Sequence, residues 1–234
     1  HDRMVCQEGV YKTAISAIKL AKSKGFCVMT NSTIFQGEDA AEFRRFFDDN
    51  MAMGLDGMMI SPGYAYEKAP EQQLFLKQEQ SKAWFKEALK DWRQKGWAFN
   101  HSPFYMDFLE GKRRYDCTPW GNPLRNVFGW QRPCYLMNEG GYAKTYGELL
   151  KTTDWSKYGH ASGNPKCLNC MTHCGFEPTS VAEAFSSISS FFELVADFAS
   201  IKAPRKVALS YDRSGTYEEV LAKAEPKQTA GSKR

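Results

Sequence analysis

The sequence predicts an α/β protein with parallel strands, followed by an irregular cysteine-rich region and a C-terminal helix. Two observations support this fold class. Helical and strand-like segments alternate along the first hundred residues, which is typical of parallel strands joined by helices. The strand-like segments are short and mostly apolar, as in strands that are buried on both faces. After residue 101 the alternation stops, and cysteine, proline and aromatic residues become frequent.

Apolar residues that recur every three or four positions predict helices over residues 11–24, 40–53 and 72–95. Gly25 and Gly54 are expected to end the first two of these helices. Strands are predicted over residues 26–35 and 57–61. Two strands cannot bury each other, and the chain opens on His1 rather than methionine. We therefore expect the 234 residues to be part of a longer protein whose upstream half completes the sheet.

The second half of the chain is less regular. Residues 100–138 are predicted to form hairpins and turns, and residues 146–151 a short helix. Residues 180–201 have the pattern of one amphipathic helix, whose apolar face consists of Val181, Phe185, Ile188, Phe192, Val195 and Phe198. We expect this face to pack on the protein body, because the charges of the helix are acidic and would not suit an anionic bilayer. From residue 203 the chain is charged and non-periodic, which predicts a disordered tail.

The charge distribution argues against nucleic acid as a partner. The net charge is +4, but residues 202–234 contain eight Lys or Arg and four Asp or Glu, so the preceding residues are neutral overall. A nucleic-acid-binding domain usually has a basic stripe. The longest run without charged residues spans 13 residues, 25–37, whereas a membrane-spanning helix needs about 20 apolar residues. No transmembrane segment and no export signal are therefore predicted.

Five of the seven cysteines lie in the C-terminal half, and they predict a metal or cluster site. They are Cys117, Cys134, Cys167, Cys170 and Cys174. The C-x2-C pair can direct two thiolates at one ion, and thiolates suit both zinc and iron–sulfur clusters. Five candidates exceed the usual four ligands, and His173 could replace one of them. The alternative is that these are reduced, buried cysteines that act as small apolar residues.

Polar and small residues follow both predicted strands, at residues 31–33 and 61–64. Ligands of α/β proteins gather at the carboxyl ends of parallel strands, although the same residue types are common in ordinary turns. An aromatic block over residues 120–134, together with Tyr64 and Tyr66, could line an apolar pocket. Alternatively, it forms a small aromatic core that braces the cysteine site.

Five segments resemble the radical S-adenosylmethionine (SAM) enzymes of hopanoid biosynthesis, the adenosyl-hopene transferases. The segments are VCQEGVY (5–11), SPGYAYE (61–67), CTPWGNP (117–123), RNVFGWQRPCY (125–135) and CLNCMTHCG (167–175). The similarity runs from His1 to about Ala199. In addition, the C-x11-G-x4-C element that ends at Cys134 resembles the opening of the SPASM/twitch extension found in many radical SAM enzymes.

The resemblance implies that residues 1–101 are the second half of a partial (β/α)6 barrel. Residues 102–176 would then be a cysteine-rich extension, residues 177–201 a C-terminal helix and residues 202–234 a tail. By the same resemblance, the SAM side of the barrel is lined by Asn31, Ser61, Pro62 and Gly63. The five C-terminal cysteines would hold an auxiliary iron–sulfur cluster or zinc, although their C-x2-C-x3-C spacing departs from the SPASM pattern.

The implied reaction joins a 5′-deoxyadenosyl group to the terminal alkene of a hopene such as diploptene. A 4Fe–4S cluster passes one electron to SAM, which releases methionine, and a second electron and a proton complete adenosylhopane. A flavodoxin or ferredoxin would supply the electrons, in the cytoplasm or at the inner face of the membrane. The C-x3-C-x2-C motif for this cluster is absent from these residues, so the chain alone is not expected to cleave SAM. Alternatives are a SPASM-type enzyme with another substrate and a zinc-stabilised, non-catalytic module.

Overall fold

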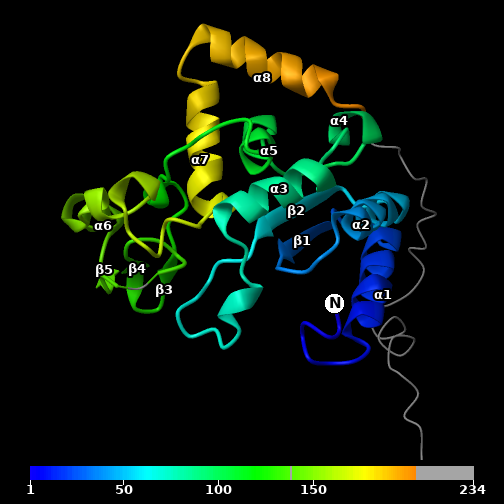
Figure 1. The fold of residues 1–234 in the computed structure, drawn as a ribbon, viewed down its shortest axis with the longest axis horizontal. Coiled ribbons are helices and arrows are strands. Elements are labelled where there is room, and N and C mark those ends of the chain that lie inside the picture. Colours follow the sequence, from blue (N-terminus) through cyan, green and yellow to red (C-terminus); the bar gives the residue numbers. More distant parts are fainter. Residues whose placement is uncertain (138, 204–234) are drawn as a thin grey trace, which may run out of the picture. The chain divides into compact units, whose positions relative to one another are not determined.

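The structure is a computed structural model that describes residues 1–137 and 139–203 (Figure 1). The described residues divide into two compact units, one of residues 1–28 and the other of residues 29–137 and 139–203. The predicted tail lies, from residue 204 on, outside the described residues. The protein is mixed α/β, as predicted.

The first unit contains helix α1 (Val10–Ser23), which confirms the helix predicted over residues 11–24. The Asp2 carboxylate accepts hydrogen bonds from the backbone N–H groups of Gly9 and Tyr11, both at 2.7 Å. These bonds provide partners for N–H groups near the helix start, where the helix itself offers none. Gly25 follows the helix with φ 82°, a left-handed conformation that glycine adopts without strain.

The second unit begins with two parallel strands, β1 (Met29–Ile34) and β2 (Gly57–Pro62), connected by α2 (Ala40–Ala52). The register pairs Met29 with Gly57 and Ile34 with Pro62. Asp39 caps α2 by accepting a hydrogen bond from Ala41 N. The helix predicted over residues 40–53 and the strand over residues 57–61 are thus confirmed, whereas the first strand begins three residues later than predicted.

The expectation that both strands are buried on both faces holds only for β2. In β1, exposed residues alternate with more buried ones, and the exposed ones are Met29, Asn31 and Thr33. The physical reason is composition, because four of its six residues are polar and can remain in contact with water on one face. The other face is covered by α2, whose Asn50 amide contacts Thr30 Oγ1 at 3.4 Å.

A short extended segment adds to the free edge of β2. Met58 N donates to Ala98 O and Asn100 N donates to Met58 O, both at 2.8 Å, and Met58 pairs with Phe99 in a parallel bridge. The core beneath the sheet is aromatic. The Phe47 ring lies 5.1 Å from Trp97 and 5.2 Å from Phe99, in edge-to-face geometry.

The predicted polar helix over residues 72–95 is three separate pieces, namely η1 (Gln72–Leu74), α3 (Gln78–Ala88) and α4 (Trp92–Lys95). A further helix, α5 (Pro103–Leu109), lies where hairpins and turns were predicted, so that prediction was wrong for these residues. Further along the same range, residues 125–131 do form an antiparallel hairpin. All seven residues of α5 are buried. A helix buried all round has no apolar stripe, and its period is therefore invisible in the sequence.

The remaining elements surround the cysteines. A short antiparallel sheet contains β3 (Arg125–Asn126), β4 (Gly129–Gln131) and β5 (Tyr142–Ala143). Helix α6 (Tyr146–Thr152) confirms the short helix predicted there. The 3-10 turns are η2 (Pro119–Gly121), η3 (Trp155–Lys157) and η4 (His160–Ser162). Figure 1 shows α6 next to the small sheet, whose strands β4 and β5 it contacts. Helix α7 (His173–Ala184) follows the cysteine loop.

The single helix predicted over residues 180–201 is two helices, α7 and α8 (Ile188–Ser200). The chain turns between them, and Ser187 caps α8 by accepting a hydrogen bond from Ser190 N at 3.0 Å. The expectation that the apolar face packs on the protein body is also wrong, because all six of its residues are exposed. Among the described residues, no helix combines the length and the apolar character needed to span a bilayer.

Candidate metal centre

Five cysteine side chains line one cavity of about 30 Å³ in the second unit. Cys117 precedes η2, Cys134 follows β4, Cys167 and Cys170 lie in the loop before α7, and Cys174 is in the first turn of α7. The structure therefore brings together the whole set of candidate ligands. Cys6 and Cys27 are exposed and lie elsewhere in the chain, and all seven cysteines are free thiols.

The segment around Cys117 is held against the first turn of α7. Thr118 donates to Gly175 O through its backbone N–H, at 2.9 Å, and through its hydroxyl, at 3.1 Å. The Cys117 sulfur lies so close to Gly175 that any side chain at position 175 would overlap it. Glycine at this position thus permits Cys117 and Cys174 to share one cavity.

The Cys134 loop is organised by Gln131, a buried residue that the sequence analysis did not identify. Its side-chain Nε2 lies 3.1 Å from Cys134 O, 3.0 Å from Tyr135 O and 3.0 Å from Met137 O. One amide group therefore serves three carbonyls of the same loop. In the sequence, Gln131 could have been noticed as a long polar residue that follows Gly129 and Trp130 in a short strand.

The loop that contains the C-x2-C pair is a tight turn. Cys170 N donates to Cys167 O at 3.0 Å, and the His160 ring lies 2.8 Å from Cys170 O through Nε2. The buried hydroxyl of Tyr105 donates to Met171 O at 2.9 Å. These bonds fix the backbone of the loop from two sides, so the two cysteines are held close to the cavity while their side chains remain free to rotate.

Burial raises the pKa of all five cavity thiols. It raises the pKa of Cys134 to about 11, and the neighbouring Cys170 and Cys167 add to this increase. Lys166 also lines the cavity, but its ammonium group is paired with Glu67 at 3.1 Å and Glu139 at 2.6 Å. Neutral thiols are thus favoured, and the thiolate forms require a positive charge within the cavity.

The chemistry of the donor set suits one soft metal ion, although the side chains are not arranged around an ion as they stand. Five sulfurs are the ligands that zinc and similar ions prefer, and the volume suffices for one water-sized group. A four-iron cluster is larger and would require the walls to move. As the side chains stand, no three Cys, His, Asp or Glu of the described chain are arranged to hold an ion, so binding also requires side-chain rotations.

His173, the other candidate ligand, does not line this cavity. Its Nδ1 atom is buried without a hydrogen-bond partner, and its ring lies 6.0 Å from that of His101. Burial, followed by the influence of His101, lowers the pKa of His173. The structure therefore separates His173 from the five cysteines, although it is adjacent to Cys174 in sequence.

A second pocket, of about 690 Å³, adjoins the cysteine cavity. It begins where β2 ends, and it is lined by Gly63, Tyr64 and Tyr66 on one side and by Leu136, Met137 and Cys170 on the other. The two Tyr rings lie edge to face at 5.1 Å. Burial, followed by Cys170, raises the pKa of Tyr64 well above its usual value, so its hydroxyl stays protonated.

The strand-end residues are distributed unevenly around this pocket. Gly63 lines it, whereas Ser61 and Pro62 are buried in the last positions of β2. Asn31 is exposed in the middle of β1 and pairs with Met59 in the register. Two positions further along the strand, Thr33 pairs with Ser61. Because side chains alternate along a strand, Asn31 and Ser61 occupy the same face of the sheet.

The aromatic block contributes little to either pocket. Trp120 packs against Trp155 with ring centroids 5.0 Å apart, and Trp130 packs against Tyr146 at 5.3 Å. These contacts join the small sheet and η2 to the segments around α6. The aromatic residues of the block therefore pack against neighbouring segments while remaining partly exposed. Pro133 and Cys134, at the end of the block, and Pro119, just before it, line the cysteine cavity.

A comparison with known sequence families matches residues 58–194 to a domain of unknown function, DUF3463. The matched stretch includes β2 except its first residue, the larger pocket and all five cavity cysteines. No curated protein and no solved structure matches the chain.

Proposed function

The chain belongs to the DUF3463 family, and we propose that it is the part of a radical SAM adenosyl-hopene transferase that contacts the hopene. The proposal rests on the resemblance of five sequence segments to these enzymes. One structural observation supports it most directly. The pocket of about 690 Å³ opens at the carboxyl end of a parallel strand and shares a wall with the cysteine cavity.

The pocket has the size of a small-molecule site, and part of its lining is apolar. Small-molecule sites usually enclose about 300–1,000 Å³ and combine apolar walls with a few polar groups. Leu76, Leu136 and Met137 supply apolar surface, and Tyr64 and Tyr66 supply aromatic surface. The Glu67–Lys166–Glu139 ion pairs lie at the same pocket, where they connect the loop after β2 to the cysteine loop.

SAM would bind on the sheet face that includes Asn31 and Ser61, near Gly63. This face of β1 is polar and exposed, which suits a polar cofactor better than an apolar one. When bound with its reduced cluster, SAM supplies a 5′-deoxyadenosyl group that joins the terminal alkene carbon, with two electrons and one proton consumed and methionine released. The cysteines of that cluster must come from sequence outside these 234 residues. A flavodoxin or ferredoxin is the proposed electron donor.

The five cavity cysteines are proposed to hold one structural metal ion, with zinc as the favoured ion. The gathering of five sulfurs around one small cavity supports a site for a single ion. The same observation favours one alternative function, a zinc-stabilised module without catalysis. A SPASM-type enzyme with another substrate is the other alternative. The protein is proposed to act in the cytoplasm, where its lipid substrate requires contact with the inner face of the membrane.

The test is adenosylhopane formation by the full-length protein, supplied with SAM, diploptene and reduced flavodoxin under anaerobic conditions. Ala65 is exposed and lines the pocket, so Ala65→Trp should fill it without disturbing the core. We expect Ala65→Trp to lower product formation at least tenfold. Ala161→Trp, at an exposed position away from the pocket, is the matched control.

The outcomes separate the candidate functions. Product formed equally by Ala65→Trp and the wild type would exclude this pocket as the hopene site. No product, with one zinc and no iron in the anaerobically purified protein, would support the non-catalytic module. Product from a different substrate class would support the SPASM-type alternative.

A further inference from the structure

Helix α8 presents its apolar side to the exterior and its polar side to the protein. The exposed fraction is 79% for Ile188, 65% for Phe192 and 53% for Phe198. Together with neighbouring residues these form an apolar face, defined as Phe185, Ile188, Phe191, Phe192, Val195 and Phe198. The side that faces the protein contains Ser190, Leu194 and Asp197, which are less exposed. Large apolar patches are uncommon on protein surfaces and often mark binding sites.

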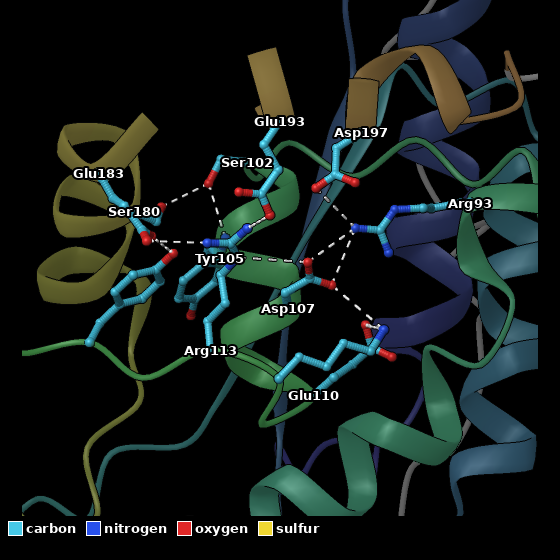
Figure 2. A network of polar contacts seen from close by, with 12 residues as sticks. Arg93, Ser102, Tyr105, Asp107, Glu110, Arg113, Ser180, Glu183, Glu193 and Asp197 are labelled. Atoms are coloured by element: carbon cyan, nitrogen blue, oxygen red, sulfur yellow. Dashed lines mark hydrogen bonds and ion pairs between the residues drawn. The ribbon is translucent and has the colours of Figure 1, made fainter. Parts of the chain in front are cut away.

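Ion pairs hold the helix in this orientation. Glu193 pairs with Arg113, and Asp197 lies 3.5 Å from Arg93. Figure 2 shows both carboxylates of α8 directed at these arginines. Both arginines are largely buried, and each also pairs with Asp107. Rotating α8 to bury its phenylalanines would leave two arginines without these partners, which is costly for buried charges.

The same ion pairs remove the electrostatic objection to an anionic surface. Glu193 and Asp197 are the charged residues of α8, and both carboxylates are paired with arginines. Glu183 of α7 is likewise paired with Arg113, at 3.2 Å. The apolar face therefore carries no unpaired acidic group that would repel anionic lipids.

The sequence next to the face is basic. Lys202, two residues after the end of α8, is exposed, and residues 202–234 carry eight Lys or Arg against four Asp or Glu. An aromatic and aliphatic helix face beside a basic segment complements an anionic lipid surface. With 13 residues, α8 is too short to cross a bilayer and would lie along its surface.

We infer that the apolar face of α8 binds the surface of an anionic membrane, to which the net positive charge of the sequence from Lys202 onward adds electrostatic attraction. The phenylalanine rings enter the boundary between headgroups and acyl chains, and the Arg93 and Arg113 pairs keep the rings directed outward. This inference is independent of the proposed enzymatic function, because it uses no residue of either pocket.

The test measures co-sedimentation of the full chain with vesicles. Vesicles of phosphatidylcholine alone are compared with vesicles in which about one lipid in three is the anionic phosphatidylglycerol. We expect binding to both, tighter to the anionic vesicles, with the difference reduced by salt. The double variant Phe185→Ser, Phe192→Ser should weaken binding to both vesicle types at least tenfold, since it removes two inserting rings.

Controls distinguish this site from general adhesion. Phe128 is 74% exposed at the tip of the β3–β4 hairpin, so Phe128→Ser removes an equally accessible ring elsewhere. It should leave vesicle binding unchanged. Because all three phenylalanines are exposed, the variants should keep the wild-type melting temperature. Absence of sedimentation with either vesicle, or an equal loss in Phe128→Ser, would overturn the inference. The inference would also fail if the wild type formed a dimer that the double variant did not form, and neither protein bound vesicles.

Discussion

The His101 ring connects β2 to α7 through Glu177. His101 Nδ1 lies 3.1 Å from Glu177 Oε2, and His101 Nε2 accepts a hydrogen bond from Ile60 N at 3.0 Å. Because Nε2 accepts from a backbone N–H, Nδ1 must carry the proton and donate it to the carboxylate. The second carboxylate oxygen of Glu177 accepts from Ser102 N at 2.6 Å. This chain of bonds ties the parallel sheet to the helix that carries Cys174.

His101→Ala is therefore expected to destabilise the protein by about 2–4 kcal/mol. The substitution leaves the buried Ile60 N–H and one Glu177 oxygen without partners. Glu177→Gln keeps one acceptor and should cost less, about 1–2 kcal/mol. Urea unfolding followed by circular dichroism measures both changes. A loss below 0.5 kcal/mol for His101→Ala, on the order of a typical surface substitution, would contradict the connecting role.

Replacing the cavity cysteines one at a time should reduce metal content. We expect at least four of the five Cys→Ser variants at positions 117, 134, 167, 170 and 174 to lose bound zinc and to melt at lower temperature. A chelator should lower the melting temperature of the wild type for the same reason. Cys6→Ser and Cys27→Ser are the controls, since both residues are exposed and outside the cavity. Equal metal content in all seven variants would exclude the site.

Gly175→Ala should disrupt the contact between the Cys117 segment and α7. The added methyl group would overlap the Cys117 sulfur, and the segment would have to shift, at a cost of about 1–3 kcal/mol. Zinc affinity should fall as well. Gly147→Ala in α6 is the matched control, because nothing lies near an added methyl there. It should stabilise the helix by about 0.5–1 kcal/mol. Thermal unfolding should give a lower melting temperature for Gly175→Ala and a higher one for Gly147→Ala. Equal shifts of the melting temperature in the two variants would refute the prediction.

Glu110 should make stability fall as pH rises. Burial raises the pKa of its carboxyl group, and the Lys112 ammonium at 2.8 Å only partly offsets this effect. The unfolded state then loses the proton at lower pH than the folded state does. The folded state is favoured below the unfolded pKa, and this advantage is lost as pH rises through the folded pKa.

The measurement is the free energy of unfolding of wild type and Glu110→Gln between pH 4 and pH 8. We expect the variant to lose less stability than the wild type over this range, because glutamine does not ionise. Glu79→Gln is the control, since Glu79 is exposed and paired with Lys82, which lowers the pKa of its carboxyl group. Because a lowered pKa makes stability rise with pH, Glu79→Gln should lose more stability than the wild type over the same range. A Glu110→Gln profile parallel to that of the wild type would contradict the prediction.

Local patterns in the sequence determined the elements with a clear period and a clear end. Helices α1 and α2 have apolar residues every three or four positions and a glycine after them, and β2 is a short apolar run between helices. The candidate metal ligands were also identified from the sequence, because cysteines are few and their C-x2-C-x3-C spacing is itself informative. These features depend on neighbouring residues alone.

Tertiary structure alone decided which distant residues meet and which side of a helix is buried. Cys117 and Cys174 share a cavity because Thr118 bonds to Gly175, 57 positions away. Gln131 holds the Cys134 loop through hydrogen bonds from its side-chain amide. The pattern of α8 predicted a buried apolar face, but Arg93 and Arg113 bind its acidic side and reverse its orientation. Such outcomes depend on partners supplied by other segments, and a local sequence pattern contains no information about them.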